Sequence, residues 1–289
     1  GKKLGVVTTA DVFDATPAAN AVHTSNRGAG TGIVDQYFDD RSKTGLTVLL
    51  GGGRKWFLPN SAIAPFPTTC TGGAPNAGGA GCGTAGGAAN FNGSARSSST
   101  DYTLPADVVT GWTDGATGAP SAGTIDIGRN LIADFTAAGW SYASDKTTMS
   151  AAPNGQPLLG LFSLSNMNVA LDKISGRRDK NFANPPTTVT PKVVDDYGFP
   201  DQPMLDEMTG KALAVLDASS PNGFVLMVEG ASIDKQAHNM DSERWIVDTV
   251  EFDRSIALAQ QYAATHPDTL VLITADHELV PGDSWGYRD

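Results

Sequence analysis

The stretch from Phe224 to His238 constrains the fold of this chain most strongly. It opens with the apolar run Phe224–Val228, which is too short for a helix but has the length of a strand buried on both faces of a parallel sheet. Glu229 follows at the end of the run, and a helix that begins near Asp234 would bring Asp234 and His238 to one face. A carboxylate and an imidazole at this spacing match the ligands that zinc prefers, although a surface helix with an incidental histidine has the same pattern.

A second stretch near the end of the chain repeats this arrangement. The run Thr269–Thr274 is short, apolar and β-branched, so it also predicts a buried strand, and Asp276 and His277 follow it closely. In open α/β sheets, functional groups gather beyond the carboxyl ends of the strands. We therefore expect the two pairs of acid and imidazole to converge on one metal-binding region.

Segments along most of the chain resemble the alkaline phosphatase family. Two of them look like the metal-binding motifs of that family: Val228-Glu-Gly-Ala-Ser-Ile-Asp-Lys-Gln-Ala-His238 and Thr274-Ala-Asp-His277. Four others agree in the family's order: Gly5-Val-Val-Thr-Thr9, Asp14-Ala-Thr-Pro17, Leu50-Gly-Gly-Gly-Arg-Lys-Trp-Phe57 and Leu158-Leu-Gly-Leu-Phe162. The resemblance implies hydrolysis of phosphate monoesters, with inorganic phosphate as a product.

The resemblance further implies two zinc ions and one magnesium ion. Asp234 and His238 would bind one zinc ion, and Asp276 and His277 would bind the other. Two such ions a few ångströms apart can stabilise the charge that develops during phosphoryl transfer.

Glu229 and Thr16 would bind the magnesium ion, because an oxygen-only ligand set suits a hard cation. Asp14 and Lys235 fall on two positions just outside that ligand set, where Lys235 would pair with Asp14 and lend positive charge to bound phosphate through water. The residues themselves also permit another role for Thr16. Threonine before Pro17 is typical of a helix N-cap with proline at the first helical position.

Arg27 falls on the family's arginine that clamps the substrate phosphate with its two-pronged guanidinium. Its spacing alone favours a solvated arginine at a helix end, and the preceding Asp14-Ala-Thr-Pro17 segment favours the clamp. The resemblance also implies a serine nucleophile and a metal-bridging aspartate upstream of this sequence, and a last zinc histidine downstream of its second motif. We recognise none of the three here, so we expect this chain alone to be inactive.

Two other interpretations stay open. Related metal-dependent phosphomutases and sulfatases use a similar two-metal scaffold, and the context of Thr16 and Arg27 favours a phosphatase over them. A protein of another class, a non-catalytic metal-binding module without its nucleophile segment, also fits.

The composition limits the kind of protein. The chain has 289 residues, of which 40% are hydrophobic, so it can bury a sizeable core. Its formal net charge of −11 and the absence of a basic run argue against a surface that binds nucleic acid. No apolar run approaches the length of a membrane span, no signal segment opens the chain, and its start at Gly1 without a methionine is typical of a processed or truncated piece.

Strands and helices are expected to alternate, which predicts an α/β fold of three layers: a mostly parallel central sheet with helices on both faces. Further strands are predicted at 4–9, 46–50, 140–143 and 158–162, and helices at 125–135, 204–216 and 242–264. The last helix should rest its apolar side on the sheet and leave its charged side in solvent. The triplet Gly51–Gly53 lacks a phosphate-binding pattern and is interpreted as a turn beneath the sheet.

We expect one domain over residues 1–289, incomplete at both ends, with a peripheral insertion rich in glycine and serine at about 61–138. The insertion contains the only two cysteines, Cys70 and Cys82. A disulfide between them would imply an oxidising compartment, periplasmic or secreted, and two free thiols are the alternative. The oligomeric state stays open, and a homodimer is compatible with the sequence.

Overall fold

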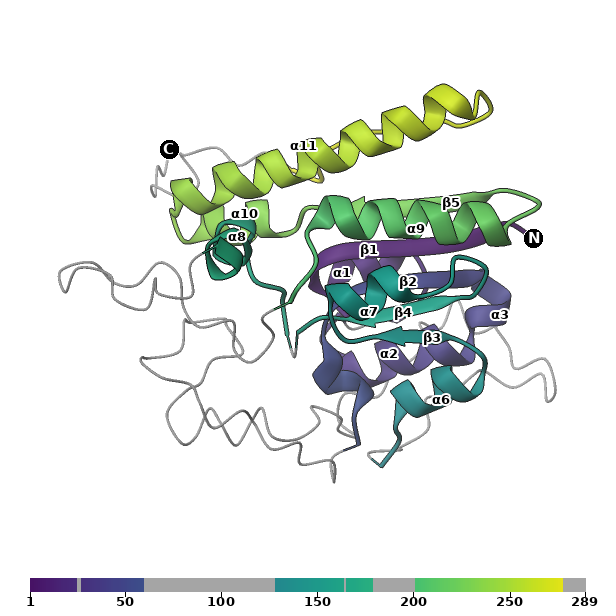
Figure 1. Cartoon of the computed structure of the whole chain (residues 1–289). Helices are drawn as coiled ribbons and strands as arrows, with labels where there is room; N and C mark the ends of the chain where they lie inside the picture. The colour runs from purple at the N-terminus through teal and green to yellow at the C-terminus, as the bar shows by residue number, and fades with distance from the viewer. Residues whose placement is uncertain (25–26, 60–127, 164, 179–200, 278–289) are drawn as a thin grey trace.

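The computed structural model describes residues 1–24, 27–59, 128–163, 165–178 and 201–277 (Figure 1). Within these residues five strands form one sheet in the order β3-β4-β2-β1-β5, and all the neighbouring strands run parallel. The strands are β1 (Lys3–Asp11), β2 (Leu46–Gly52), β3 (Ser141–Ala143), β4 (Leu158–Leu161) and β5 (Phe224–Glu229). The predicted parallel sheet is confirmed.

Helices connect the strands and cover both faces of the sheet, as the predicted three-layer α/β class requires (Figure 1). In chain order the helices are α1 (Ala15–Ala19), α2 (Gly30–Asp39), α3 (Arg41–Thr44), the 3₁₀ helix η1 (Arg54–Phe57), α6 (Leu131–Ala137), α7 (Lys146–Ala151), α8 (Ala170–Arg178), α9 (Leu205–Ser219), α10 (Ser232–His238) and α11 (Ser242–Thr265).

The apolar side chains of the central strands β1, β2 and β4 divide between two different cores. Val6 packs in a core with side chains of α2, α6 and η1, whereas Val7 packs in a second core with side chains of α7 and α9. Leu158 and Leu159 of β4 divide between the two cores in the same way. Continuous apolar strands of this kind are typical of parallel sheets that are buried on both faces. Strand β5 lies at the edge of the sheet and its Val225 is 55% exposed, so the predicted burial of this strand on both faces is wrong.

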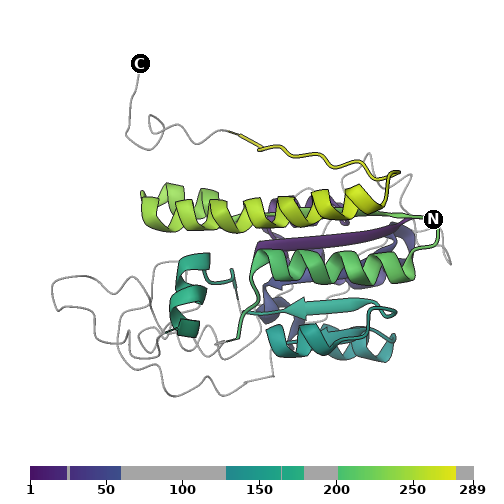
Figure 2. The ribbon, with the colours of Figure 1, turned by 45° about the horizontal axis from the view of Figure 1, so that its top comes forward.

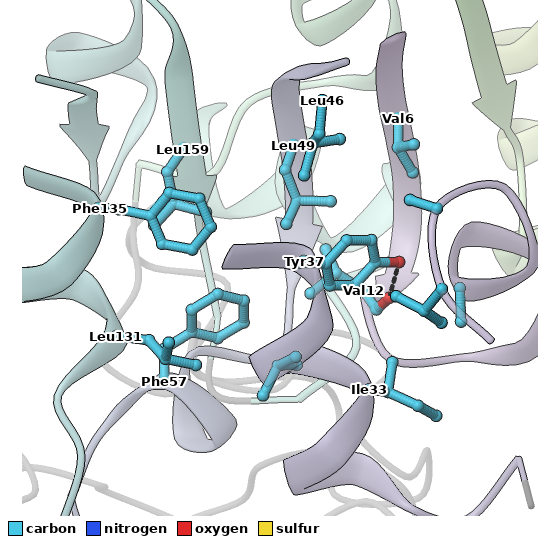
Figure 3. Close-up of a cluster of buried hydrophobic side chains, with 14 of the residues drawn as sticks. Val6, Val12, Ile33, Tyr37, Leu46, Leu49, Phe57, Leu131, Phe135 and Leu159 are labelled. Carbon is cyan, nitrogen blue, oxygen red and sulfur yellow. Dashed lines mark hydrogen bonds between the residues drawn. The ribbon is translucent and has the colours of Figure 1, made fainter. Parts of the chain in front are cut away.

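Figure 3 shows the first of these cores, where aromatic side chains fill the space between the sheet and its helices. Phe135 of α6 contacts Phe38 edge to face, with ring centroids 4.9 Å apart. Tyr37 of α2 is buried and donates a hydrogen bond to the Val12 carbonyl at 2.8 Å, so its only polar atom has a partner. This bond ties α2 to the chain just after β1.

The helix predicted near residues 125–135 is present as α6, which lies within the range assigned to the insertion. Its Leu131 and Phe135 are fully buried. Residues 131–137 therefore belong to the core of the fold and not to the peripheral insertion. Residues 60–127, with Cys70 and Cys82, lie outside the described residues, so the disulfide and the periplasmic or secreted location stay predictions.

Helix α11 has the predicted bounds but does not pack as predicted. Its fully buried residues are polar, namely Arg244, Asp248, Glu251 and Ser255. The expected solvation of the charged side is therefore wrong: this side faces α8 and the start of α9, where Lys173 and backbone amides pair with the acids. A buried charge is tolerated when it has such partners, and the apolar pattern alone does not reveal them.

The predicted strand at Thr269–Thr274 is not formed. Thr269 donates its N–H to the His266 carbonyl at 3.0 Å, and the chain then runs back alongside α11 (Figure 2). Leu272 is 81% exposed, and within the described part of the chain no backbone ladder joins this segment to β5. A cavity of about 540 Å³ lies between the segment and β5. The segment has strand propensity, but within the described residues no strand is paired with it.

Among the described residues, none of the helices has both the length and the apolar character of a membrane span.

Candidate functional site at the carboxyl edge of the sheet

Both β1 and β5 end at one edge of the sheet, and most of the predicted site residues lie there. Thr8 of β1 is aligned with Glu229 of β5, and Gly230 then turns the chain towards α10. The N–H of Ser232 donates to Thr9 Oγ1 at 3.2 Å, which fixes the start of α10 on β1. Parallel pairing therefore brings residues more than two hundred positions apart to the same edge.

Two hydroxyl groups lie near the Glu229 carboxylate. Thr8 Oγ1 donates to Glu229 Oε2 at 2.6 Å, and the Thr16 side chain lies close enough to influence the pKa of this carboxylate. Burial raises the pKa of Glu229, while the hydroxyl groups of Thr8 and Thr16 and the charge of Lys235 oppose that rise. The site thus combines a carboxylate that is costly to ionise with hydroxyl oxygens around it.

Thr16 is not the N-cap of its helix, so the capping interpretation is wrong. Helix α1 begins at Ala15 with Asp14 at the cap, and Pro17 occupies its third position. The Ala18 N–H donates to the Asp14 carbonyl at 3.0 Å, which sets this earlier start. The Thr16 hydroxyl is consequently available to the Glu229 carboxylate.

Asp14 and Lys235 form the predicted pair. Lys235 Nζ lies 2.7 Å from Asp14 Oδ2, and both side chains are partly buried. The pair joins the loop after β1 to α10, so it links the two segments that carry Thr16 and Glu229.

Asp234, in the first predicted motif, lies near a histidine of each motif. Its Oδ1 atom is 3.3 Å from His238 Nε2 and 3.8 Å from His277 Nε2. His277 Nε2 is also 3.5 Å from Asp276 Oδ2. The unpaired segment after α11 thus still brings the second motif to the first. Among the residues that the structure describes, no group of three or more acidic, histidine or cysteine side chains is arranged to bind a metal ion.

The Asp234 carboxylate itself fits a metal ligand. Its Oδ1 atom is buried and makes no hydrogen bond, although it faces two imidazole nitrogens. A buried carboxylate oxygen without a donor is costly, and a cation bound there would satisfy it. The donor set of carboxylate and imidazole suits zinc, whereas the oxygens of Glu229 and Thr16 suit magnesium.

Arg27 is exposed, and the described residues include no hydrogen bond or ion pair between it and the other predicted site residues. The structure therefore does not bring the predicted phosphate clamp into contact with them.

The turn at Gly51–Gly53 lies at this same edge, because Gly52 of β2 is aligned with Asp11 of β1. Its interpretation as a turn beneath the sheet is therefore wrong. The three glycines are needed for close packing: a Cβ at Gly52 would lie 1.8 Å from the Ser165 carbonyl oxygen. The side chains of Lys55 and Asp11 meet next to this turn.

Sequence reasoning missed the buried cluster around Asp11. Trp56 Nε1 donates to Asp11 Oδ2 at 3.0 Å, the Phe13 N–H donates to Oδ1 at 3.2 Å, and Lys55 Nζ lies 3.5 Å from Oδ2. Burial raises the pKa of Asp11 to about 6, while the charge of Lys55 opposes that rise. The available signal was an acid at the end of an apolar strand, but its side-chain partners Lys55 and Trp56 lie more than forty residues away in the sequence.

The chain is similar in sequence to known phosphatases. The chain is 31% identical to the streptomycin-6-phosphate phosphatase of Streptomyces griseus over 98% of its own length and 54% of that protein. It is 35% identical to the alkaline phosphatase of Escherichia coli K12 over 52% of its length and 32% of that enzyme. The chain thus spans about half, or less, of these relatives.

Solved structures support the fold. The alkaline phosphatase of Thermus thermophilus aligns with 93% of this chain at a TM-score of 0.57 and 23% identity, and the alignment covers 38% of that chain. A cold-active alkaline phosphatase from Shewanella aligns with 93% of the chain at a TM-score of 0.54 and 22% identity, over 42% of its own chain. The sequence model of the alkaline phosphatase family matches residues 1–78 and 107–284. The chain therefore belongs to the alkaline phosphatase family.

Proposed function

We propose that this chain is the metal-binding part of an enzyme that hydrolyses phosphate monoesters. The observation that carries the proposal is the position of Asp234, whose buried oxygen faces the imidazoles of both motifs. Family membership indicates a phosphatase. The relative from Streptomyces griseus is named for one phosphate monoester, but nothing at the described edge selects a particular ester.

In this proposal Asp234 and His238 bind one zinc ion, and Asp276 with His277 binds a second. Zinc bound there would stabilise negative charge on the phosphoryl oxygens. The chain's own contribution is to bring the carboxylates and imidazoles together from two distant segments. The contacts between His277 and Asp234 support a shared site.

Glu229 and Thr16 are proposed to bind magnesium, supported by the proximity of the two side chains and their oxygen-only chemistry. The partly buried pair of Asp14 and Lys235 holds the two segments together. Arg27 is proposed to bind the substrate phosphate, and this assignment rests only on its position in the sequence.

A zinc-binding measurement tests the first part of this proposal. Asp234→Asn in the purified chain should weaken zinc affinity by about tenfold or more, because loss of even an outer-shell partner of a metal ligand has an effect of that size. Asp253→Asn is the matched control, since Asp253 is an exposed acid on α11. Equal zinc affinity of the two variants, measured by competition with a chromogenic chelator, would contradict the proposed ligand.

Turnover of p-nitrophenyl phosphate tests the second part. We propose that the 289-residue chain alone does not hydrolyse it with zinc and magnesium added, because no nucleophile is assigned within the chain. Turnover that disappears in Asp276→Ala would show that the chain contains a nucleophile. p-Nitrophenyl sulfate, assayed in parallel, distinguishes a sulfatase.

A further inference from the structure

The buried cluster around Asp11 joins three strand ends at the carboxyl edge. Asn166, in the loop after β4, accepts the Asp11 N–H through its Oδ1 atom at 2.9 Å. Ser165 of the same loop accepts a hydrogen bond from Lys55 Nζ at 2.9 Å, and its carbonyl accepts the Gly53 N–H at 2.9 Å. The ends of β1, β2 and β4 are thus held together around one carboxylate.

The Asp11 carboxylate packs directly on the backbone of the glycine turn. Gly53 has a φ of +93°, and a Cβ at this position would lie 2.1 Å from Asp11 Oδ1. Only glycine accepts both this backbone conformation and this contact. A longer acid could not occupy the same space, so the turn fixes where the carboxylate lies.

The same carboxylate determines how the chain leaves β1. Asp11 Oδ1 accepts the Phe13 N–H, and the Asp11 carbonyl accepts the Asp14 N–H at 2.9 Å. Side chain and backbone of one residue therefore close the turn that leads into α1. This turn presents Asp14 to Lys235 and, two residues later, Thr16 to Glu229.

We propose that Asp11 is a positioning residue for the magnesium site. It does not contact the ion; with Lys55 and Trp56 it holds the turn that carries Asp14 and Thr16 towards Glu229. The proposal rests on the magnesium site of the proposed function.

Asp11→Asn separates positioning from a purely structural role. The folded-state pKa of Asp11 is about 6, above its ordinary value of 3.8, so its contribution to stability is present below pH 4 and is lost as the pH rises through 6. At pH 8 the buried negative charge opposes folding. Asparagine removes that charge, so the metal-free variant should melt at or above the temperature of the wild type at pH 8, with little difference at pH 4.

Magnesium affinity should change in the opposite direction. Asparagine presents an amide where Lys55 and Trp56 require a carboxylate, so the turn loosens, and we expect magnesium affinity to fall by about tenfold, the effect typical of residues that orient metal ligands. Trp56→Phe removes the Nε1 donor together with part of the ring that packs on Phe13, and it should weaken magnesium binding in the same direction. Asp40→Asn is the matched control: Asp40 is 2% exposed and pairs with Lys43 at 2.9 Å, but it caps α3 at the opposite edge.

The experiment is calorimetric titration of the purified chain with magnesium at pH 8, with thermal melting of each metal-free variant. Magnesium affinity that falls in Asp11→Asn while the melting temperature holds or rises supports the proposal. A parallel fall of both quantities would show a structural role only. Wild-type affinity in Asp11→Asn, with loss in Glu229→Ala, would overturn the positioning role alone, whereas wild-type affinity in Glu229→Ala as well would overturn the magnesium site itself.

Discussion

Lys173→Met tests whether the buried charges between α8 and α11 stabilise the fold. The side chains of Lys173 and Glu251 are only 1% and 2% exposed, and Nζ donates to Oε1 at 2.7 Å. Lys173 also donates to the Pro203 carbonyl at 3.2 Å. Asp248 lies close by, and its pKa is raised by burial and by the charge of Glu251, while Lys173 opposes the rise. Methionine would leave two buried acids without their cation.

The expected loss follows from the geometry. At 2.7 Å and an effective dielectric constant of about 20, the pair attracts by roughly 6 kcal/mol before desolvation is counted. Removing lysine also removes the cost of burying it, and the Leu205 N–H still donates to Glu251 Oε1 at 2.8 Å. We therefore expect the free energy of unfolding to fall by about 3–5 kcal/mol, the range for a buried pair that loses one partner. The melting temperature should fall on the order of 10 °C.

Urea unfolding of the purified chain, followed by circular dichroism, measures this loss. Lys146→Met is the matched control, because the Lys146–Glu207 pair is 36% and 29% exposed and should contribute no more than about 1 kcal/mol. The double variant Lys173→Met with Glu251→Gln removes one of the two unpaired charges but keeps an acceptor for Leu205, so it should recover part of the loss. A loss in Lys173→Met no larger than in Lys146→Met, or a double variant no more stable than the single one, would refute the reasoning.

Two further predictions concern the fold and the charge of the site. Leu159→Ala should lower the free energy of unfolding by about 2–5 kcal/mol because Leu159 is fully buried, whereas Leu272→Ala should change it by less than about 0.5 kcal/mol; a large effect of Leu272→Ala in urea unfolding would show that the segment after α11 packs against the fold. Binding of inorganic phosphate, measured by calorimetry, should require zinc and magnesium and should vanish after chelation with EDTA while circular dichroism stays unchanged; phosphate binding that survives chelation would show that side chains alone hold the anion.

The sequence predicts the architecture well because its signals are local. An unbroken apolar run such as Phe224–Val228 indicates a strand without knowledge of its neighbours, and β5 has these bounds to within one residue. Its predicted burial on both faces is wrong, because burial depends on the position of the strand in the sheet and β5 lies at the edge. The helix predicted at 204–216 is likewise present as α9, which buries Leu205, Met208 and Leu216. The run at 269–274 has the same local signal, yet it stays unpaired because strand formation also requires a partner strand in register.

The candidate site is predictable only in part, for the same reason. Asp234 and His238 are four residues apart on one helix, so their proximity follows from helical geometry. Lys55 and Asp11, or Lys173 and Glu251, meet only because the fold brings distant segments together. Such pairs produce no periodic pattern in the sequence, and the sequence does not distinguish a buried lysine from an exposed one.

The distribution of charge at the carboxyl edge bears on how a protein of formal net charge −11 would attract phosphate. Two lysines lie at this edge, but Lys235 is paired with Asp14 and Lys55 with Asp11. Each lysine is neutralised by an acid, and Glu229 and Asp234 add further carboxylates. These six side chains therefore carry a net negative charge when ionised. Divalent cations bound among them would reverse that sign, because the two charges on each ion act over the short distances within the site. The same carboxylates that would repel phosphate in the metal-free chain are the groups that would recruit those cations, so we expect metal binding to precede phosphate binding.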